Sequence, residues 1–182
     1  MTNYYLVFQS AVSSATSQKL IATMAQLVNQ GATEINLMLS TPGGEVASGL
    51  AIYNFIRSLP ITINTHNIGN VDSIGNAIFL AGKTRKACQH STFMFHGVGF
   101  QAPNVVFEEK FLRERLDGIL ADQKRIGDII LQMTKITDRK VRELFREART
   151  KDANYALKCG IISEISDVSI PSGMPIITVV TS

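Results

Sequence analysis

Residues 61–81 read Ile-Thr-Ile-Asn-Thr-His-Asn-Ile-Gly-Asn-Val-Asp-Ser-Ile-Gly-Asn-Ala-Ile-Phe-Leu-Ala. The run from Ile61 to Ile68 is typical of a β-strand, and the small and apolar run from Asn76 to Ala81 is typical of a helix. Ser73 lies between them, in a turn with glycines on both sides. Such a turn lets a hydroxyl stand clear of its backbone, and the helix N-terminus supplies unpaired N–H groups and a positive dipole end. The pattern indicates a nucleophile.

The segments before this stretch alternate between strand and helix. Strands are predicted at 4–8 and 35–39, each followed by an amphipathic helix, the first ended by Gly31 and the second by Pro60. This alternation predicts right-handed βαβ crossovers and a largely parallel sheet, so the fold class is α/β. The loops at the carboxyl ends of the strands, including 40–44 and the Ser73 turn, are where a site is expected.

The segments after the Ser73 helix begin with a buried strand, Thr92 to His96, whose last residue is polar. One long amphipathic helix is predicted from about 105 to 133. Shorter helices at 138–149 and 152–158 and a strand at 161–165 complete the core. The tail at 169–182 is either an additional strand or a contact arm. We expect the 182 residues to form a single domain.

Composition narrows the classes of function. Charged residues make up only 18% of the chain, which leaves surface for other subunits to cover and makes a homo-oligomer plausible. The net charge of +3 is mild and its basic residues are dispersed, so a nucleic-acid partner is not expected. Cys88 and Cys159 have neither metal-ligand nor disulfide-framework spacing, so we expect reduced thiols, no metal and no cofactor. The absence of a leader pattern or a long apolar segment predicts a cytoplasmic protein without a membrane partner.

A serine nucleophile requires a base and N–H donors for the oxyanion that it creates. His96, at the end of the neighbouring strand, is the candidate base, whereas His66 and His90 are interpreted as structural or surface residues. The amides of Gly43 and Ile74 are the candidate oxyanion donors. Gly43 suits this role because a backbone that approaches a substrate closely has no room for a Cβ.

Four motifs follow one another in the chain: Ser40-Thr41-Pro42-Gly43-Gly44-Glu45-Val46, Gly49-Leu50-Ala51-Ile52-Tyr53, Gly69-x-x-x-Ser73-Ile74-Gly75 and Phe93-Met94-Phe95-His96. In this order and spacing they resemble the proteolytic subunit of Clp protease, and the similarity covers roughly residues 4 to 166. The resemblance implies a ClpP/crotonase-like superhelical spiral of βαβ units. It also implies a serine endopeptidase in which Ser73 is the nucleophile, His96 the general base, and Gly43 with Ile74 the oxyanion donors. The long helix resembles the handle by which two rings stack, so the implied assembly is a ring-stacked homo-oligomer acting on peptides or unfolded chains.

Two departures from the family pattern stand out. An ungapped match puts Ala148 where the family has the aspartate of its triad, which predicts reduced activity because an alanine cannot orient an imidazole. Glu147 and Asp152 are the candidate substitutes, if the loop shifts. The first strand begins almost at the N-terminus, which makes coupling to a Clp ATPase partner doubtful.

The sequence alone leaves three other functions open. A catalytically impaired ring subunit with a structural or regulatory role is motivated by Ala148. A crotonase-type acyl-CoA enzyme would share the scaffold and a backbone oxyanion hole, but it explains neither Ser73 nor His96 economically. A Ser-Lys peptidase resembling signal peptide peptidase A would need a lysine beside Ser73, and its candidates, Lys110 and Lys124, lie on the long helix.

Overall fold

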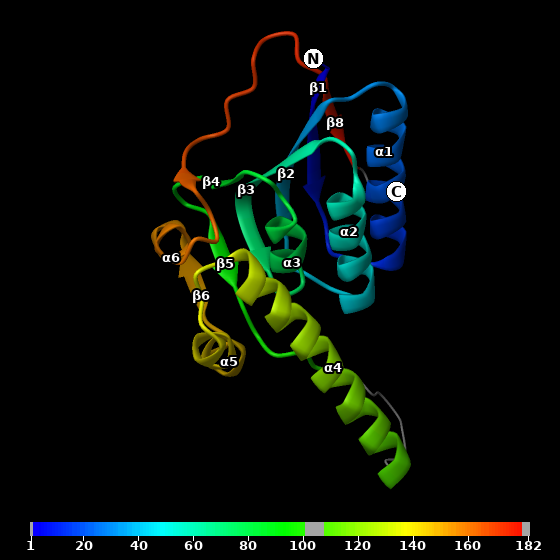
Figure 1. The fold of residues 1–182 in the computed structure, drawn as a ribbon, viewed down its shortest axis with the longest axis vertical. Coiled ribbons are helices and arrows are strands. Elements are labelled where there is room, and N and C mark those ends of the chain that lie inside the picture. Colours follow the sequence, from blue (N-terminus) through cyan, green and yellow to red (C-terminus); the bar gives the residue numbers. More distant parts are fainter. Residues whose placement is uncertain (1, 101–107, 180–182) are drawn as a thin grey trace.

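The computed structural model describes residues 2–100 and 108–179. These residues form one eight-stranded sheet and the helices that pack around it (Figure 1). The architecture is mixed α/β, as the sequence predicts. The elements in chain order are β1 Asn3–Gln9, α1 Ser14–Asn29, β2 Glu34–Thr41, α2 Val46–Ser58, β3 Thr62–Asp72, α3 Gly75–Leu80, β4 Arg85–Ala87, β5 Thr92–Met94, α4 Glu109–Met133, α5 Asp138–Glu147, β6 Thr150–Asp152, α6 Ala153–Lys158, β7 Glu164–Ile165 and β8 Ile176–Thr178.

The strand β3 organises the sheet around the Ser73 turn. The main path runs β6-β5-β3-β2-β1-β8, and β4 joins β3 to β7. The first half of β3 pairs with β4 through Thr65 to Asn67, and its last residues, Asn70 to Asp72, pair with β5. The strand predicted to end at Ile68 therefore continues to Asp72, because a second partner takes over the ladder after the first one ends.

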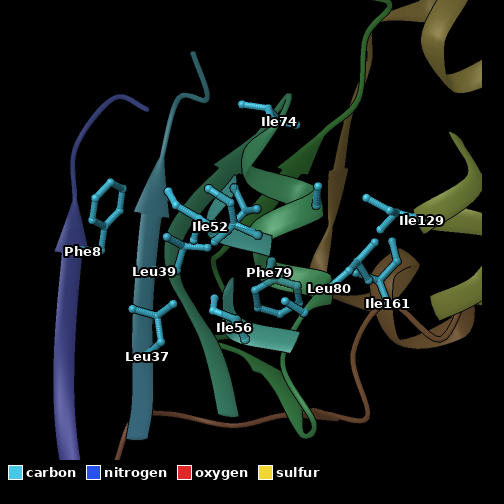
Figure 2. Packing of buried hydrophobic residues seen from close by; sticks show 14 of the residues in the cluster. Phe8, Leu37, Leu39, Ile52, Ile56, Ile74, Phe79, Leu80, Ile129 and Ile161 are labelled. Atoms are coloured by element: carbon cyan, nitrogen blue, oxygen red, sulfur yellow. The ribbon is translucent and has the colours of Figure 1, made fainter. Parts of the chain in front are cut away.

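One face of the sheet carries the core. Leu6, Leu37 and Ile63 point to this face from adjacent parallel strands, and each is nearly or fully buried. Figure 2 shows side chains of the same cluster, with Ile52 and Ile56 of α2 and Phe79 of α3 packed between the strands and helices. Because successive side chains of a strand alternate between faces, this pattern fixes which residues point away from the core.

The opposite face of the central strands is polar. Asn64 donates to Asn36 Oδ1 across the β2–β3 pair, and the two strands run parallel in register there. His66, two residues further along β3, donates from Nε2 to the carbonyl oxygen of Ser166 at 2.9 Å. Burial lowers the pKa of His66, because desolvation disfavours the charged imidazolium.

Two strands are shorter than their sequence patterns predict. β5 stops at Met94, short of His96, because its partner β3 ends at Asp72 opposite Met94. β7 is confined to Glu164–Ile165 in place of the predicted 161–165. Ile161 and Ile162 instead donate their N–H groups to Ala156 O and close α6. The short strand β6 is not evident from the sequence.

The helix α4 projects away from the body of the molecule (Figure 1). Its described part begins at Glu109, and positions 105–107 of the predicted helix lie outside the described residues. Leu112, Leu116 and Leu120 are 47%, 54% and 53% exposed, and their spacing of four puts them on one face of the helix. We call these three residues the leucine stripe.

The C-terminal tail contributes a strand. β8 pairs in parallel with β1, where Tyr5 is opposite Ile176 and Val7 is opposite Thr178. The sequence leaves two alternatives for 169–182, an additional strand or a contact arm. The described part of this tail, which ends at residue 179, forms the additional strand. Residues 180–182 lie outside the described part of the chain.

Candidate active site

Ser73 occupies a strained turn between β3 and α3. Its φ is 56°, and apart from Ala148 it is the only described residue other than glycine with a positive φ. A left-handed conformation at a non-glycine residue costs on the order of 1–3 kcal/mol, so the surrounding contacts must hold it. The Ser73 N–H donates to Met94 O at 2.8 Å, which ties the turn to the end of β5. A sharp strand-to-helix turn of this kind can hold a nucleophile.

The loop after β2 packs directly against this turn. Gly43 has a φ of 83°, and a Cβ added to it would lie 2.6 Å from Ser73 Cβ and 2.8 Å from Asp72 O. Only glycine fits at this approach. The N–H of Gly43 donates to Thr41 Oγ1 at 3.1 Å, so an oxyanion at this position would take over a hydrogen bond that the protein now makes internally.

Ile74 follows Ser73 and anchors the turn in the core. Its side chain is fully buried and lies against Gly49 of α2, where an added Cβ would collide with Ile74 Cγ1. Among the described residues, no hydrogen bond uses the Ile74 N–H. Its amide is therefore available to an incoming oxygen, as an oxyanion donor must be.

His96 lies two residues beyond the end of β5 and is partly buried. Its Nδ1 is 2.6 Å from Gly97 O. Because a carbonyl oxygen only accepts, Nδ1 carries the proton and Nε2 presents a lone pair, which is the tautomer that a general base requires. Within the described residues, no hydrogen bond joins His96 to Ser73 Oγ. Such contacts are often long in the absence of substrate.

Ala148 lies close to the histidine segment. The antiparallel ladder of β5 with β6 ends at the pair of Met94 with Thr150, and His96 and Ala148 each lie two residues beyond it. The end of α5 also contacts this segment, because Gly97 N–H donates to Phe145 O at 2.9 Å. Ala148 itself is exposed and left-handed, with a φ of 50°. Ala148 thus offers no polar side chain to the His96 segment.

Glu147 and Asp152 are engaged elsewhere. The Glu147 carboxylate lies 3.8 Å from Lys151 Nζ, and Asp152 accepts the Tyr155 N–H at 2.7 Å as the N-cap of α6. Asp152 is opposite Thr92, four residues before His96, which corresponds to about 13 Å along a strand. Neither carboxylate has a hydrogen bond to His96 among those of the described residues.

The remaining candidates lie away from the Ser73 turn. Lys110 pairs with Glu114 and Lys124 with Asp128, both within α4. His90 is exposed, and His66 lies on the polar face of the sheet. In the described ranges, no group of three or more histidine, cysteine or acidic side chains is arranged to hold a metal ion. No helix formed by these residues combines the length and the apolar character needed to cross a membrane.

The structure adds two groups that the sequence patterns do not single out. Gly97 contributes its carbonyl oxygen to His96, and backbone contacts of this kind leave no sequence signal. Asn76 contributes its amide to Ser73 O and Met94 O. A signal existed for Asn76, because it is an amide side chain within the otherwise apolar, fully buried helix α3.

Comparisons with known proteins give matches over most of the chain. The sequence matches the Clp protease family over residues 1–169. It is 29% identical over 172 residues to ATP-dependent Clp protease proteolytic subunit 2 of Chlamydia trachomatis, covering 88% of this chain and 83% of that protein. It is 30% identical over 138 residues to the protein of the same name from Corynebacterium efficiens, covering 71% and 69% respectively.

A solved structure shares the fold. The chain superimposes on a mutant of ClpP1 from Listeria monocytogenes with a TM-score of 0.81, at 18% identity, covering 90% of this chain and 91% of that one. This similarity confirms the ClpP-like fold that the motifs predict. The roles of Ser73, His96, Gly43 and Ile74 stay predictions.

Proposed function

Since the chain belongs to the Clp protease family, we propose that it is a serine endopeptidase that cleaves peptide bonds in peptides or unfolded chains. The observation that carries this proposal is the Ser73 turn. A left-handed serine between β3 and α3, with a glycine loop packed on it, has the form of a nucleophile held for attack. A capping serine would not require a strained backbone.

The chemistry assigns one role to each group. Ser73 Oγ attacks the carbonyl carbon of the substrate while His96 Nε2 takes the hydroxyl proton. The N–H groups of Ile74 and Gly43 stabilise the oxyanion. His96 then gives its proton to the departing amine, and a water molecule, activated by the same nitrogen, releases the acyl group from Ser73.

The third member of the site is atypical in this proposal. We assign the orientation of His96 to the Gly97 carbonyl, because that oxygen lies 2.6 Å from Nδ1 whereas Glu147 and Asp152 have other partners. A neutral carbonyl fixes the tautomer but adds no negative charge beside the imidazolium. We therefore expect a slower enzyme than one with a buried aspartate at this place.

The leucine stripe supports a homo-oligomeric ring or a stack of rings. Exposed leucines at a spacing of four along a projecting helix form an apolar strip that a second copy of the chain would cover. The leucine stripe gives no reason to expect a Clp ATPase partner. Cleavage of peptides or unfolded protein does not require one.

Labelling with a fluorophosphonate tests the proposal. We expect stoichiometric modification at Ser73, its loss in Ser73→Ala, and a fall of at least about 100-fold in the labelling rate of His96→Gln. Ser48→Ala is the matched control, since this serine on α2 donates to Glu45 and lies outside the site. Native mass spectrometry of the same sample gives the oligomeric state: a labelled monomer would refute the ring and leave the peptidase standing.

The alternative function is a catalytically impaired ring subunit, and the observation that favours it is an alanine, Ala148, just beyond the ladder that joins β6 to the strand leading to His96. In that case the wild-type protein forms the oligomer but takes up no label at any pH. The two functions thus predict opposite results in one experiment.

A further inference from the structure

Asn76 is a buried amide beside the nucleophile. It belongs to α3 and is 1% exposed. Its Nδ2 lies 3.1 Å from Ser73 O and 2.8 Å from Met94 O. Both partners are carbonyl oxygens, which only accept, so the NH₂ group must face them and the orientation of the amide is fixed by chemistry.

The two hydrogen bonds join the two halves of the candidate site. Met94 is the last residue of β5, and His96 follows it by two residues. Ser73 already donates its own N–H to Met94 O at 2.8 Å. With Asn76 in place, both polar groups of the Ser73 backbone are linked to the strand end that leads to the base.

The energetics argue against a purely stabilising role for Asn76. Its Oδ1 is buried and has no hydrogen-bond partner among the described residues. Moreover, Ser73 O also accepts the Asn76 backbone N–H, and Met94 O also accepts Ser73 N–H, so neither carbonyl depends on the side chain. An apolar residue would avoid burying an unsatisfied oxygen.

We propose that Asn76 is a positioning residue, which clamps the strained Ser73 backbone to the end of β5 and thereby sets the separation of Ser73 from His96. This inference rests on the proposed peptidase function. The clamp matters more in a site where a backbone carbonyl is the partner of His96, because backbone contacts then carry the alignment that a carboxylate would otherwise help to hold.

The test compares Asn76→Ala with Thr65→Val. Thr65 is 1% exposed and donates from Oγ1 to Phe79 O at 2.8 Å, at the opposite end of α3. Each substitution removes buried hydrogen bonding by one side chain, at opposite ends of α3. Only the side chain of Asn76 bonds to Ser73 and Met94. We expect Asn76→Ala to lower the first-order rate constant of fluorophosphonate labelling at least about 10-fold with little change in the half-saturating concentration. Thr65→Val should label at the wild-type rate, whatever its effect on the melting temperature.

Asn76→Asp provides a second readout at nearly constant shape. Its carboxylate would face two carbonyl oxygens, whereas the protonated acid can donate to one of them. The labelling rate of this variant, relative to wild type, should therefore fall as the pH rises. If Asn76→Asp labels at the wild-type rate at every pH, the clamp is overturned. Equal labelling by Asn76→Ala and Thr65→Val overturns it as well.

Hydrogen exchange separates failure of the clamp from failure of the proposed function. If wild type takes up no label, the peptidase proposal fails, and exchange of the Ser73 amide, followed by mass spectrometry of the segment 72–76, still tests the clamp. Faster exchange in Asn76→Ala than in Thr65→Val supports it. Equal exchange in the two variants overturns it.

Discussion

The two halves of the candidate site are held in different ways. The nucleophile half, which comprises the β3–α3 turn and the 41–44 loop, is fixed by close backbone approach, a buried isoleucine and several hydrogen bonds. The base half, which comprises His96, Gly97 and the end of α5, lies beyond the last ladder pair of β5 and depends on two backbone carbonyls. The candidate nucleophile is thus held by the core, whereas the candidate base is placed by the segments that follow it.

The largest expected effect comes from breaking the nucleophile half at Gly43. Gly43→Ala would put a methyl group 2.6 Å from Ser73 Cβ, so the loop or the turn must move and the oxyanion donors lose their places. We expect the rate of fluorophosphonate labelling to fall at least about 100-fold, the range measured when one oxyanion donor is removed.

Gly31→Ala is the control for backbone strain alone. Gly31 has a φ of 87°, close to the 83° of Gly43, but an added Cβ would meet nothing within 4 Å. The control should lose roughly 1–2 kcal/mol of stability from the left-handed conformation and label at the wild-type rate. Equal labelling by the two alanine variants would mean that the loop does not shape the site.

A smaller effect, in the opposite direction, is expected when a carboxylate is added to the base half. Ala148→Asp introduces a carboxylate just beyond the β5–β6 ladder, near the His96 segment, at a left-handed position that aspartate tolerates better than alanine does. A negative charge there stabilises the imidazolium formed during attack. We expect labelling about 10-fold faster than wild type, well below the ~10⁴-fold that loss of a native triad aspartate can cost.

Ala148→Asn separates charge from shape. Asparagine suits the same backbone conformation and can accept a hydrogen bond, but it carries no charge. If the aspartate and asparagine variants label at the same rate, electrostatic support of His96 is not what the wild-type site lacks. A decrease in both would place the orienting group elsewhere.

The same contrast explains what could be predicted from the sequence. The nucleophile half is local: a strand, a glycine-flanked serine and a small-residue helix are contiguous, so their pattern predicts the turn. Gly43 is further away in the chain, but it lies in the loop that follows a predicted parallel strand next to β3, so topology brings it to the same edge.

The base half depends on contacts that the sequence does not encode locally. The strand β6 is three residues long and forms only because β5 offers its free edge, so hydrophobic periodicity could not reveal it. The carbonyl of Gly97 and the amide of Asn76 act through hydrogen bonds that depend on tertiary placement. The motif resemblance predicts alanine at the place of the family's aspartate, and this stays a prediction, whereas it does not predict the Gly97 carbonyl that lies beside His96 Nδ1.

The smallest expected effect separates the pH dependence of stability from that of the site. Burial lowers the pKa of His66 from its ordinary value of 6.5, and Lys86 lowers it further, whereas the Ser166 carbonyl, Glu164 and Asp167 raise it. The unfolded chain therefore binds this proton more readily than the folded protein. The free energy of unfolding should be at its full value above pH 6.5 and decrease as the pH falls through the lowered pKa of the folded state.

His66→Gln should reduce this acid sensitivity, because glutamine keeps an N–H donor for Ser166 O but does not titrate. Melting temperatures of both proteins from about pH 7 to about pH 5 measure the difference, and the wild type should lose more. Labelling at neutral pH should be unchanged, since His66 lies on the polar face of β3 and not at the Ser73 turn. Parallel melting curves of the two proteins would assign the acid sensitivity to other groups. A loss of labelling in His66→Gln would show that the nucleophile half extends further along β3 than its contacts indicate.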